Sequence, residues 1–363
     1  AGVTYTVGRE ANATHDEIYN GIQLGQPQHN FRTFVDPYRT AGDPSSGLLP
    51  GVTAGERGIN GEGDPLVQAY NFRVCLSFAE ERLPFPEPKN YDPERYTLLA
   101  RYIDSGVFDP LTLSGEMPNR KTDTNNFGGF SSDNIGMSHR WPEAGYSERE
   151  EIFQDHVAYN QGIYWFLCHD ERVPQDIRGR VARFGLPVDE FPESGGWPHE
   201  LYIREARRMV SDVVLSEHHC IGRYTEEDSV ALAAYGMDSH NCRRIVVAGR
   251  AFNEGDVQIK VPFPYPVSFR AIIPRRGECE NLFVPWSLSA THIAFGSIRM
   301  EPVFMAIGQA AATAADLCIA HGCASHDLPY PELRDRLLAD GARLSWPQPD
   351  DAPGGNFGPI VKI

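Results

Sequence analysis

The stretch from Glu301 to Gly322 restricts the fold of this chain more than any other part of the sequence. It reads EPVFMAIGQAAATAADLCIAHG, with Glu and Pro suited to a first helical turn and a glycine suited to the end. We expect a helix over about 301–322, and its small residues allow a ligand to approach closely. The segment from Cys279 predicts an apolar strand and a polar loop before this helix. The helix amino terminus would then offer free N–H groups and partial positive charge to an anionic ligand group.

Apolar spacing predicts three further helices and one strand. The helices cover about 94–105, 147–168 and 199–214, the second with Ser147 as its capping residue. The alternation in VQAYNFRVCLSF, from Leu66 onward, predicts a strand with unequally buried faces.

Residues 1–10 have the composition of a short strand, and three other segments have that of loops. The loops are 36–66 and 84–93, which are rich in proline, and 119–136, which is rich in Asn, Asp, Ser and Gly.

Charge and composition exclude several classes of partner. The chain has 33 basic and 49 acidic residues, and its formal charge of −16 repels both nucleic-acid phosphates and anionic lipid. We therefore expect no nucleic-acid or membrane partner. No apolar run approaches the roughly 20 residues of a membrane-spanning helix, and residues 1–10 lack the features of a signal peptide.

The seven cysteines contain no C-x-x-C pair and are odd in number, which favours neither a disulfide framework nor a zinc site. The sequence leaves the localisation open between the cytoplasm and a secreted or periplasmic compartment. It also leaves the oligomeric state open.

Seven short signatures occur in order along the chain. They are VGRE, VQAYNFR, LYIREARR, YGMDSHN, NLFVP, SATH and SIRMEPVFMAIGQ, which begin at Val7, Val67, Leu201, Tyr235, Asn281, Ser289 and Ser297. In these signatures the chain resembles the bacterial FAD-dependent oxidoreductases of the glutathione-reductase-like flavoprotein superfamily. The resemblance spans nearly the whole chain.

The resemblance implies a FAD cofactor close to the amino terminus of the 301–322 helix. It places the flavin near Gly308, Gln309, Ala310 and Ser289. One element of such proteins is missing, because no window matches the G-x-G-x-x-G turn that holds the FAD pyrophosphate. We therefore expect the amino-terminal dinucleotide-binding segment to be absent and this chain to bind FAD weakly or not at all.

Strand and helix patterns alternate, so we predict an α/β class of mixed α+β character. It would combine the remnant of a FAD-binding Rossmann-like domain with a substrate or cap domain that contains a mixed sheet. The expected boundaries are a partial FAD-domain segment at 1–35, a substrate or cap domain at 36–215, a FAD-facing domain at 216–345 and a tail at 346–363.

Two histidines are candidate catalytic bases. His292 lies just before the small-residue helix, where it would act on substrate or fix the loop by bonding a backbone carbonyl. His240, in YGMDSHN, lies next to Asp238, and a carboxylate beside an imidazole can orient a general base. In the same motif, Tyr235 and Asn241 are candidate substrate contacts. The alternative is a turn whose polar side chains bond their own backbone.

Three arginines are candidates for contacts with flavin or substrate. Arg299, with Glu301, would either bracket the flavin or tighten the start of the helix. Arg204 and Arg207 would either clamp an anionic substrate group or pair with nearby carboxylates such as Glu205.

Two other clusters favour structural interpretations. His218, His219 and Cys220, read as strand neighbours, point to opposite faces, so we predict no metal site. Of the aromatic residues that could line a sugar cleft, Tyr164, Trp165, Phe166 and Trp197, we assign Phe166 to the core.

Together these features predict an oxidoreductase that oxidises a hydroxyl group of a carbohydrate or another polyhydroxylated small molecule by hydride transfer to flavin. Two alternatives remain open. One is a flavin-free hydrolase, such as a glycosidase or esterase, and the other is an inactive fragment that only binds ligand.

Overall fold

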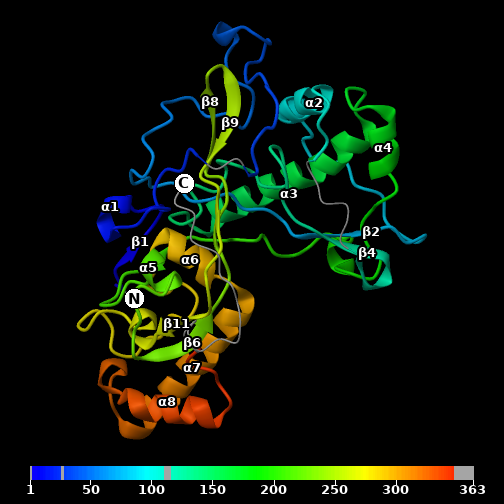
Figure 1. The fold of residues 1–363 in the computed structure, drawn as a ribbon. Helices are drawn as coiled ribbons and strands as arrows, with labels where there is room; N and C mark the ends of the chain where they lie inside the picture. The colour runs from blue at the N-terminus through cyan, green and yellow to red at the C-terminus, as the bar shows by residue number, and fades with distance from the viewer. Residues whose placement is uncertain (1, 26–27, 110–115, 347–363) are drawn as a thin grey trace, which may run out of the picture.

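The computed structural model describes residues 2–25, 28–109 and 116–346 and combines helices with small antiparallel sheets (Figure 1). The mixed α/β class predicted from the sequence is therefore confirmed. The predicted tail lies almost wholly outside the described residues.

The helices are α1 Asn12–His15, α2 Thr97–Asp104, α3 Tyr146–His169, α4 Gln175–Val181, α5 Glu217–Cys220, α6 His292–Ile298, α7 Glu301–His321 and α8 Tyr330–Ala339. The strands are β1 Tyr5–Thr6, β2 Val74–Ser77, β3 Glu116–Met117, β4 Lys121–Thr124, β5 Arg208–Met209, β6 Ser229–Ala233, β7 Met237–Ser239, β8 Arg243–Val247, β9 Arg250–Glu254, β10 Val257–Ile259 and β11 Tyr265–Ser268.

All strand pairs in the described residues are antiparallel. They are β1–β5, β2–β4, β3–β4, β6–β11, β7–β10 and β8–β9. The β8–β9 hairpin turns through Ala248 and Gly249, both at positive φ, as a two-residue turn between twisted strands requires. In the same described residues, parallel pairing is limited to an isolated bridge between Leu215 and Ala290.

Two hydrophobic clusters form the interior. The N-terminal core is built from residues 31–201 together with Ala251 and includes side chains of α2, α3 and α4. The C-terminal core is built from residues 213–344 and includes α6, α7, α8, β6 and β11. In Figure 1, α2 and α4 of the N-terminal core lie far from α7 and α8 of the C-terminal core. The predicted domain boundaries stay a prediction.

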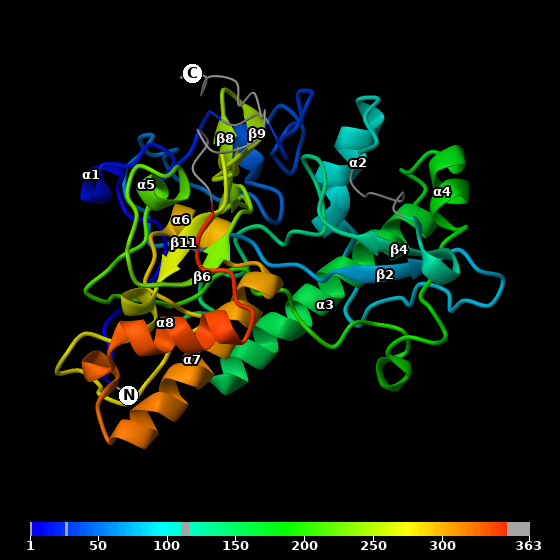
Figure 2. The ribbon, with the colours of Figure 1, turned by 60° about the horizontal axis from the view of Figure 1, so that its bottom comes forward.

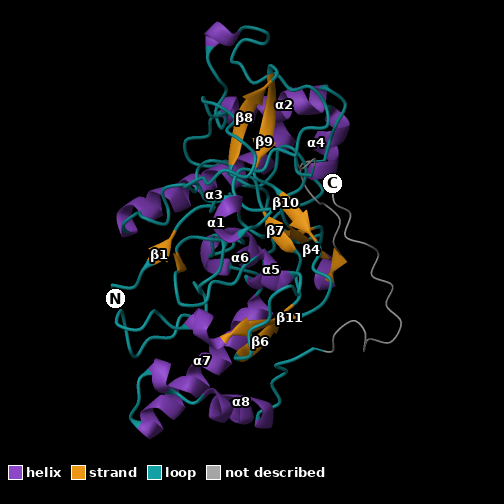
Figure 3. Cartoon of the chain, turned by 60° about the vertical axis from the view of Figure 1, so that its left-hand side comes forward, coloured by secondary structure: helices purple, strands orange, loops and turns teal. Residues whose placement is uncertain are grey.

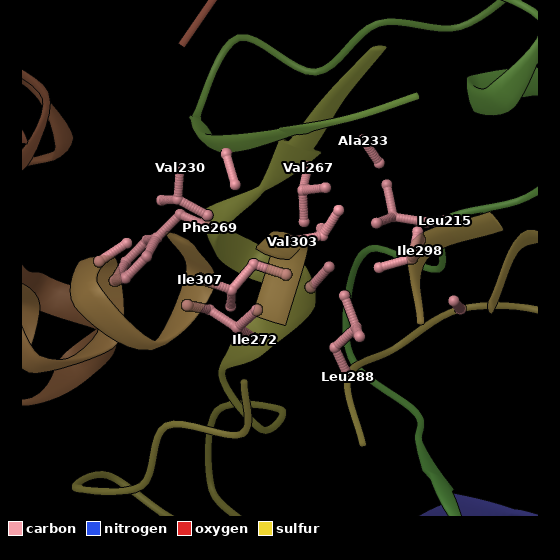
Figure 4. Packing of buried hydrophobic residues seen from close by; sticks show 14 of the residues in the cluster. Leu215, Val230, Ala233, Val267, Phe269, Ile272, Leu288, Ile298, Val303 and Ile307 are labelled. Atoms are coloured by element: carbon pink, nitrogen blue, oxygen red, sulfur yellow. The ribbon is translucent and has the colours of Figure 1, made fainter. Parts of the chain in front are cut away.

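Helix α7 contributes a regular apolar face to the C-terminal core. Val303, Ile307, Ala310 and Ala314 recur at helical spacing and are buried, and α7 packs on β6 and lies beside α8 (Figure 2). Figure 4 shows Val303 and Ile307 among the side chains of this core. By length and composition, α7 is also apolar enough to cross a membrane, a property that buried core helices share.

Three of the predicted helices are confirmed, as α2, α3 and α7, although α3 is capped by Gly145 rather than Ser147. The strand expected from Leu66 is shorter, because only Val74–Ser77 forms a ladder.

The helix predicted at 199–214 is wrong. The segment is extended, with β5 as its only regular part, because its backbone amides bond to distant segments. Tyr202 N–H donates to Asn71 and Met209 N–H donates to Ser287, which overrides the helical spacing of its side chains. His218 and His219 were also misread, since they lie on the short helix α5 and not on a strand.

Candidate functional site

A network of buried charged and polar side chains joins segments that are far apart in the sequence. It includes Arg204, Glu205 and Arg208 of the extended segment, Asp133 of a polar loop, Ser239 and His240 at the end of β7, and His292 and Arg299 at the two ends of α6. Figure 3 shows α6 and β7 between the hairpin β8–β9 and the pair α7–α8. Asp238 lies at the edge of this network, with 13% of its side chain exposed.

The first part of the network centres on His292. Its Nδ1 lies 2.6 Å from Oε2 of Glu205 and its Nε2 lies 2.9 Å from Oγ of Ser239. Its backbone N–H donates to Glu10, and the cap of α6, Thr291, positions it at the start of the helix. Both ring nitrogens are therefore occupied, and only 2% of the side chain is exposed.

The second part centres on His240. Its Nδ1 lies 2.8 Å from Oδ2 of Asp133, while its Nε2 lies 3.5 Å from Oδ2 of Asp238. Asp133 also pairs with Arg204 at 2.9 Å, and Asp238 pairs with Arg299 at 2.6 Å. The imidazole is thus fixed firmly on one side only, because 3.5 Å is too long for a strong hydrogen bond.

Both carboxylates that flank His240 are held ionised. Burial alone would raise the pKa of Asp133, but Arg204 and His240 outweigh burial and lower it. Burial also opposes the charge of Asp238, whose pKa is nevertheless lowered by His240, Arg299 and Arg204. Neither carboxylate would release or take up a proton near neutral pH.

A second imidazole, which sequence reasoning missed, lies against His240. The ring of His29 stacks on that of His240 with centroids 6.1 Å apart, and its Nδ1 lies 3.1 Å from Asp256. Burial would lower the pKa of His29, but the bond to Asp256 raises it. Asn241, a predicted substrate contact, donates to the backbone carbonyl of His29. No motif surrounds His29, so the sequence carried no signal for it.

Two tyrosines lie close to the buried arginines of the site, and some N–H groups of these arginines have no partner in the described residues. Tyr235 is 48% exposed, and Tyr202 lies under the guanidinium of Arg204 at 5.2 Å. Nε and Nη2 of Arg204 and Nε of Arg299 are buried without a hydrogen-bond partner in the described part of the chain. Such orphaned donors are rare in native proteins and suit a ligand that brings hydrogen-bond acceptors.

The other predicted site residues lie elsewhere. Arg207 is on the surface, where it pairs with Glu143. Ser289 is buried, and its Oγ accepts from the backbone of Ser211. On α7, Gln309 is exposed and Gly308 is half-buried, with nothing within 4 Å of where a Cβ would stand, while Ala310 is inside the C-terminal core.

Tyr235 and the buried arginines fit the ring end of a flavin. A flavin ring needs a flat apolar contact surface and hydrogen-bond donors toward its polar edge, and Tyr235 and the free N–H groups of Arg204 and Arg299 supply both kinds of contact. In the described residues, no group of three or more His, Cys, Asp or Glu side chains is arranged to hold a metal ion.

The aromatic run on α3 is largely structural. Tyr164 and Phe166 are buried in the N-terminal core with Trp197, which confirms the assignment of Phe166. Trp165 instead stacks on His169 at the surface end of α3.

Comparison with known proteins gives one match. No curated protein and no solved structure matches the chain. The model of the family described as FAD dependent oxidoreductase matches residues 1–337, and this family implies FAD as cofactor. Because the match covers nearly the whole chain, this protein belongs to the FAD dependent oxidoreductase family.

Proposed function

We propose that this protein oxidises a hydroxyl group of a carbohydrate or another polyhydroxylated small molecule, with His240 as the general base. The observation that carries the proposal is the asymmetric setting of His240, whose Nδ1 is bound by Asp133 while Nε2 has no short partner among the residues that the structure describes. A carboxylate that holds one ring nitrogen fixes the tautomer and leaves the other nitrogen to accept a proton.

His292 is the weaker candidate for the base. Its two nitrogens are both engaged, by Glu205 and by Ser239, and the ring is almost completely buried. A substrate hydroxyl could reach Nε2 only after the bond to Ser239 is broken. We therefore assign His292 to positioning, since it ties α6 to the segment that carries Arg204.

The neighbouring groups suit a substrate with several hydroxyls. Asp238 is ionised and partly exposed, so it can accept hydrogen bonds, while Arg204 and Arg299 have unused N–H groups that can donate them. Tyr235 offers an exposed aromatic face of the kind that stacks on sugar rings.

The proposed reaction divides the work between cofactor and protein. A bound FAD would supply the acceptor for the hydride of the substrate carbon. His240 Nε2 takes the hydroxyl proton, and Asp133 stabilises the imidazolium that results. The burial of this cluster excludes water from the base.

Anaerobic bleaching of bound flavin by a panel of sugars and polyols tests the proposal. We expect the wild-type protein to be bleached and His240→Asn to bind flavin but bleach about 10²- to 10⁴-fold more slowly. His199→Asn is the matched control, because His199 is exposed and its ion-pair partner, Glu193, is exposed as well. If H240N is bleached at the wild-type rate, His240 is not the base. If no sugar or polyol reduces the bound flavin, the proposed substrate class is wrong.

One observation favours a hydrolase as a second candidate function. Glu205, His292 and Ser239 form a hydrogen-bonded series in the order acid, base and hydroxyl that serine hydrolases use. Ser239 is, however, fully buried. A fluorophosphonate probe that labels wild-type protein but not Ser239→Ala would support hydrolysis, and an unlabelled protein that hydrolyses no ester would remove it.

A further inference from the structure

A cavity of about 250 Å³ lies in the N-terminal part of the molecule, apart from the contacts of His240. At roughly 30 Å³ per water molecule it has room for about eight waters, which is enough for a small organic ligand. Its wall includes Phe130, Tyr159, Asn134, Asp155 and Arg244.

Arg244, on β8, is buried in this wall and has no ionic partner among the described residues. Its Nε donates to Asn253 Oδ1 at 2.9 Å, and its guanidinium lies 5.0 Å from the ring centre of Phe130. No carboxylate forms an ion pair with Arg244 in the ranges that the structure describes. A buried guanidinium without a carboxylate carries a large desolvation penalty.

The other buried arginines show that this arrangement is unusual in the molecule. Arg9 pairs with Asp64 and Glu254, and Arg204, Arg208 and Arg299 pair with Asp133, Glu10 and Asp238 in turn. Burial lowers the pKa of Arg244, and the groups that oppose the shift are the Tyr159 hydroxyl and, more weakly, Asp133.

The charges around the cavity add up to a single positive charge. The other cation in the wall, Arg95, is paired with Asp155 at 3.0 Å, and Asp155 also accepts from Asn134. Arg244 is therefore the one uncompensated charge of the wall in the described residues. A singly charged carboxylate balances it, whereas a phosphate dianion would bring excess negative charge.

We propose that this cavity binds the carboxylate of a small organic acid, with Arg244 as the anion-binding group. The rings of Phe130 and Tyr159 would cover the carbon body of the acid. This site is separate from the proposed base, although Asn134 in its wall directly follows Asp133, the partner of His240. It does not depend on the proposed oxidation.

Ligand-observed fluorine NMR with 4-fluorobenzoate, and 4-fluorobenzamide as its uncharged counterpart, tests the proposal. We expect the wild-type protein to bind the benzoate and not the benzamide. Arg244→Gln should weaken benzoate binding at least about tenfold, since a charged hydrogen bond is lost. Arg334→Gln, an exposed arginine paired with Asp335, is the matched control and should bind as wild type.

Asp155→Asn tests the role of positive charge in the cavity wall by raising that charge instead of removing it. It frees Arg95 from its partner, so benzoate should bind more tightly than to the wild type. Replacing Arg244 leaves no buried carboxylate without a partner, so we expect R244Q to fold, which circular dichroism checks. If R244Q is unfolded, the benzoate affinity of D155N tests the proposal in its place.

Several outcomes would overturn the proposal. They are no benzoate binding to the wild type, equal binding of the benzamide, wild-type affinity in a folded R244Q, or no gain of affinity in D155N. Inorganic phosphate that binds more tightly than benzoate would overturn the assignment to a carboxylate.

Discussion

His292 and Glu205 meet in the interior, with Nδ1 of the imidazole 2.6 Å from Oε2 of the carboxylate and both side chains almost fully buried. The pair joins the start of α6 to the extended segment that carries Arg204 and Arg208. It therefore connects two chain segments that both contribute to the environment of His240.

Breaking this pair should destabilise the fold. We expect His292→Asn to lower the free energy of unfolding by roughly 3 kcal/mol, because the buried carboxylate of Glu205 loses a short hydrogen bond. Urea denaturation measures the loss. His199→Asn, at an exposed histidine, should stay within about 0.5 kcal/mol of the wild type. Unchanged stability of H292N would contradict the positioning role.

Substitution of two adjacent arginines in the extended segment should reduce stability by very different amounts. Arg208 is fully buried, forms ion pairs with Glu10 and Glu205 and donates to the backbone carbonyls of Gly8 and Ala290. Arg208→Met should therefore cost about 3–5 kcal/mol or prevent folding. Arg207→Met, which removes an exposed ion pair with Glu143 and a surface contact with the Tyr5 ring, should cost at most about 1 kcal/mol. Soluble yield and urea denaturation compare the two, and equal losses would argue against the buried network.

The Glu10–Arg208 pair predicts a dependence of stability on acid pH. Burial opposes ionisation, but Arg208 and the His292 amide lower the pKa of Glu10 from 4.5 to about 2. A folded-state pKa below the unfolded value means that the stabilisation is complete above about pH 4.5 and is lost as pH falls toward 2.

The size of this effect follows from the shift, at about 1.4 kcal/mol per pKa unit, and amounts to about 3 kcal/mol. Urea denaturation as a function of pH measures it. In Glu10→Gln the slope of unfolding free energy against pH between 4.5 and 3 should be clearly smaller. A slope equal to that of the wild type would assign the acid sensitivity to other carboxylates.

Local patterns were sufficient to predict α3 and α7, because each has a buried face at helical spacing and short-range backbone bonds. The prediction of a helix at 199–214 was wrong for the opposite reason. Its amides bond to Asn71 and Ser287, and no local pattern reveals partners that are so distant.

The candidate site shows the same limit. Asp238 and His240 are two positions apart, so their proximity could be predicted. Asp133 is 107 residues from His240, and the bond between them depends on the folded chain. His29 was missed because a lone histidine in a loop has no periodicity or motif to mark it.

The packing of α6 on β7 should be sensitive to one glycine. A Cβ added at Gly296 would lie 2.4 Å from the backbone oxygen of Asp238, closer than any real contact allows. Gly296→Ala should therefore push α6 away from β7 and weaken the bond between Arg299 and Asp238. We expect a loss of stability of about 1–3 kcal/mol, as for other overpacked sites.

Gly308→Ala on α7 is the matched control, and it should change the free energy of unfolding in the opposite direction. An added Cβ there meets nothing within 4 Å, and alanine favours a helix interior over glycine by about 0.5–1 kcal/mol. Urea denaturation should therefore give a higher free energy of unfolding for G308A than for the wild type, and a lower one for G296A. With His240 as the base, G296A should also slow flavin bleaching, because the carboxylate of Asp238 moves with its backbone. A G296A variant with wild-type stability and wild-type bleaching would contradict the tight contact of α6 with β7.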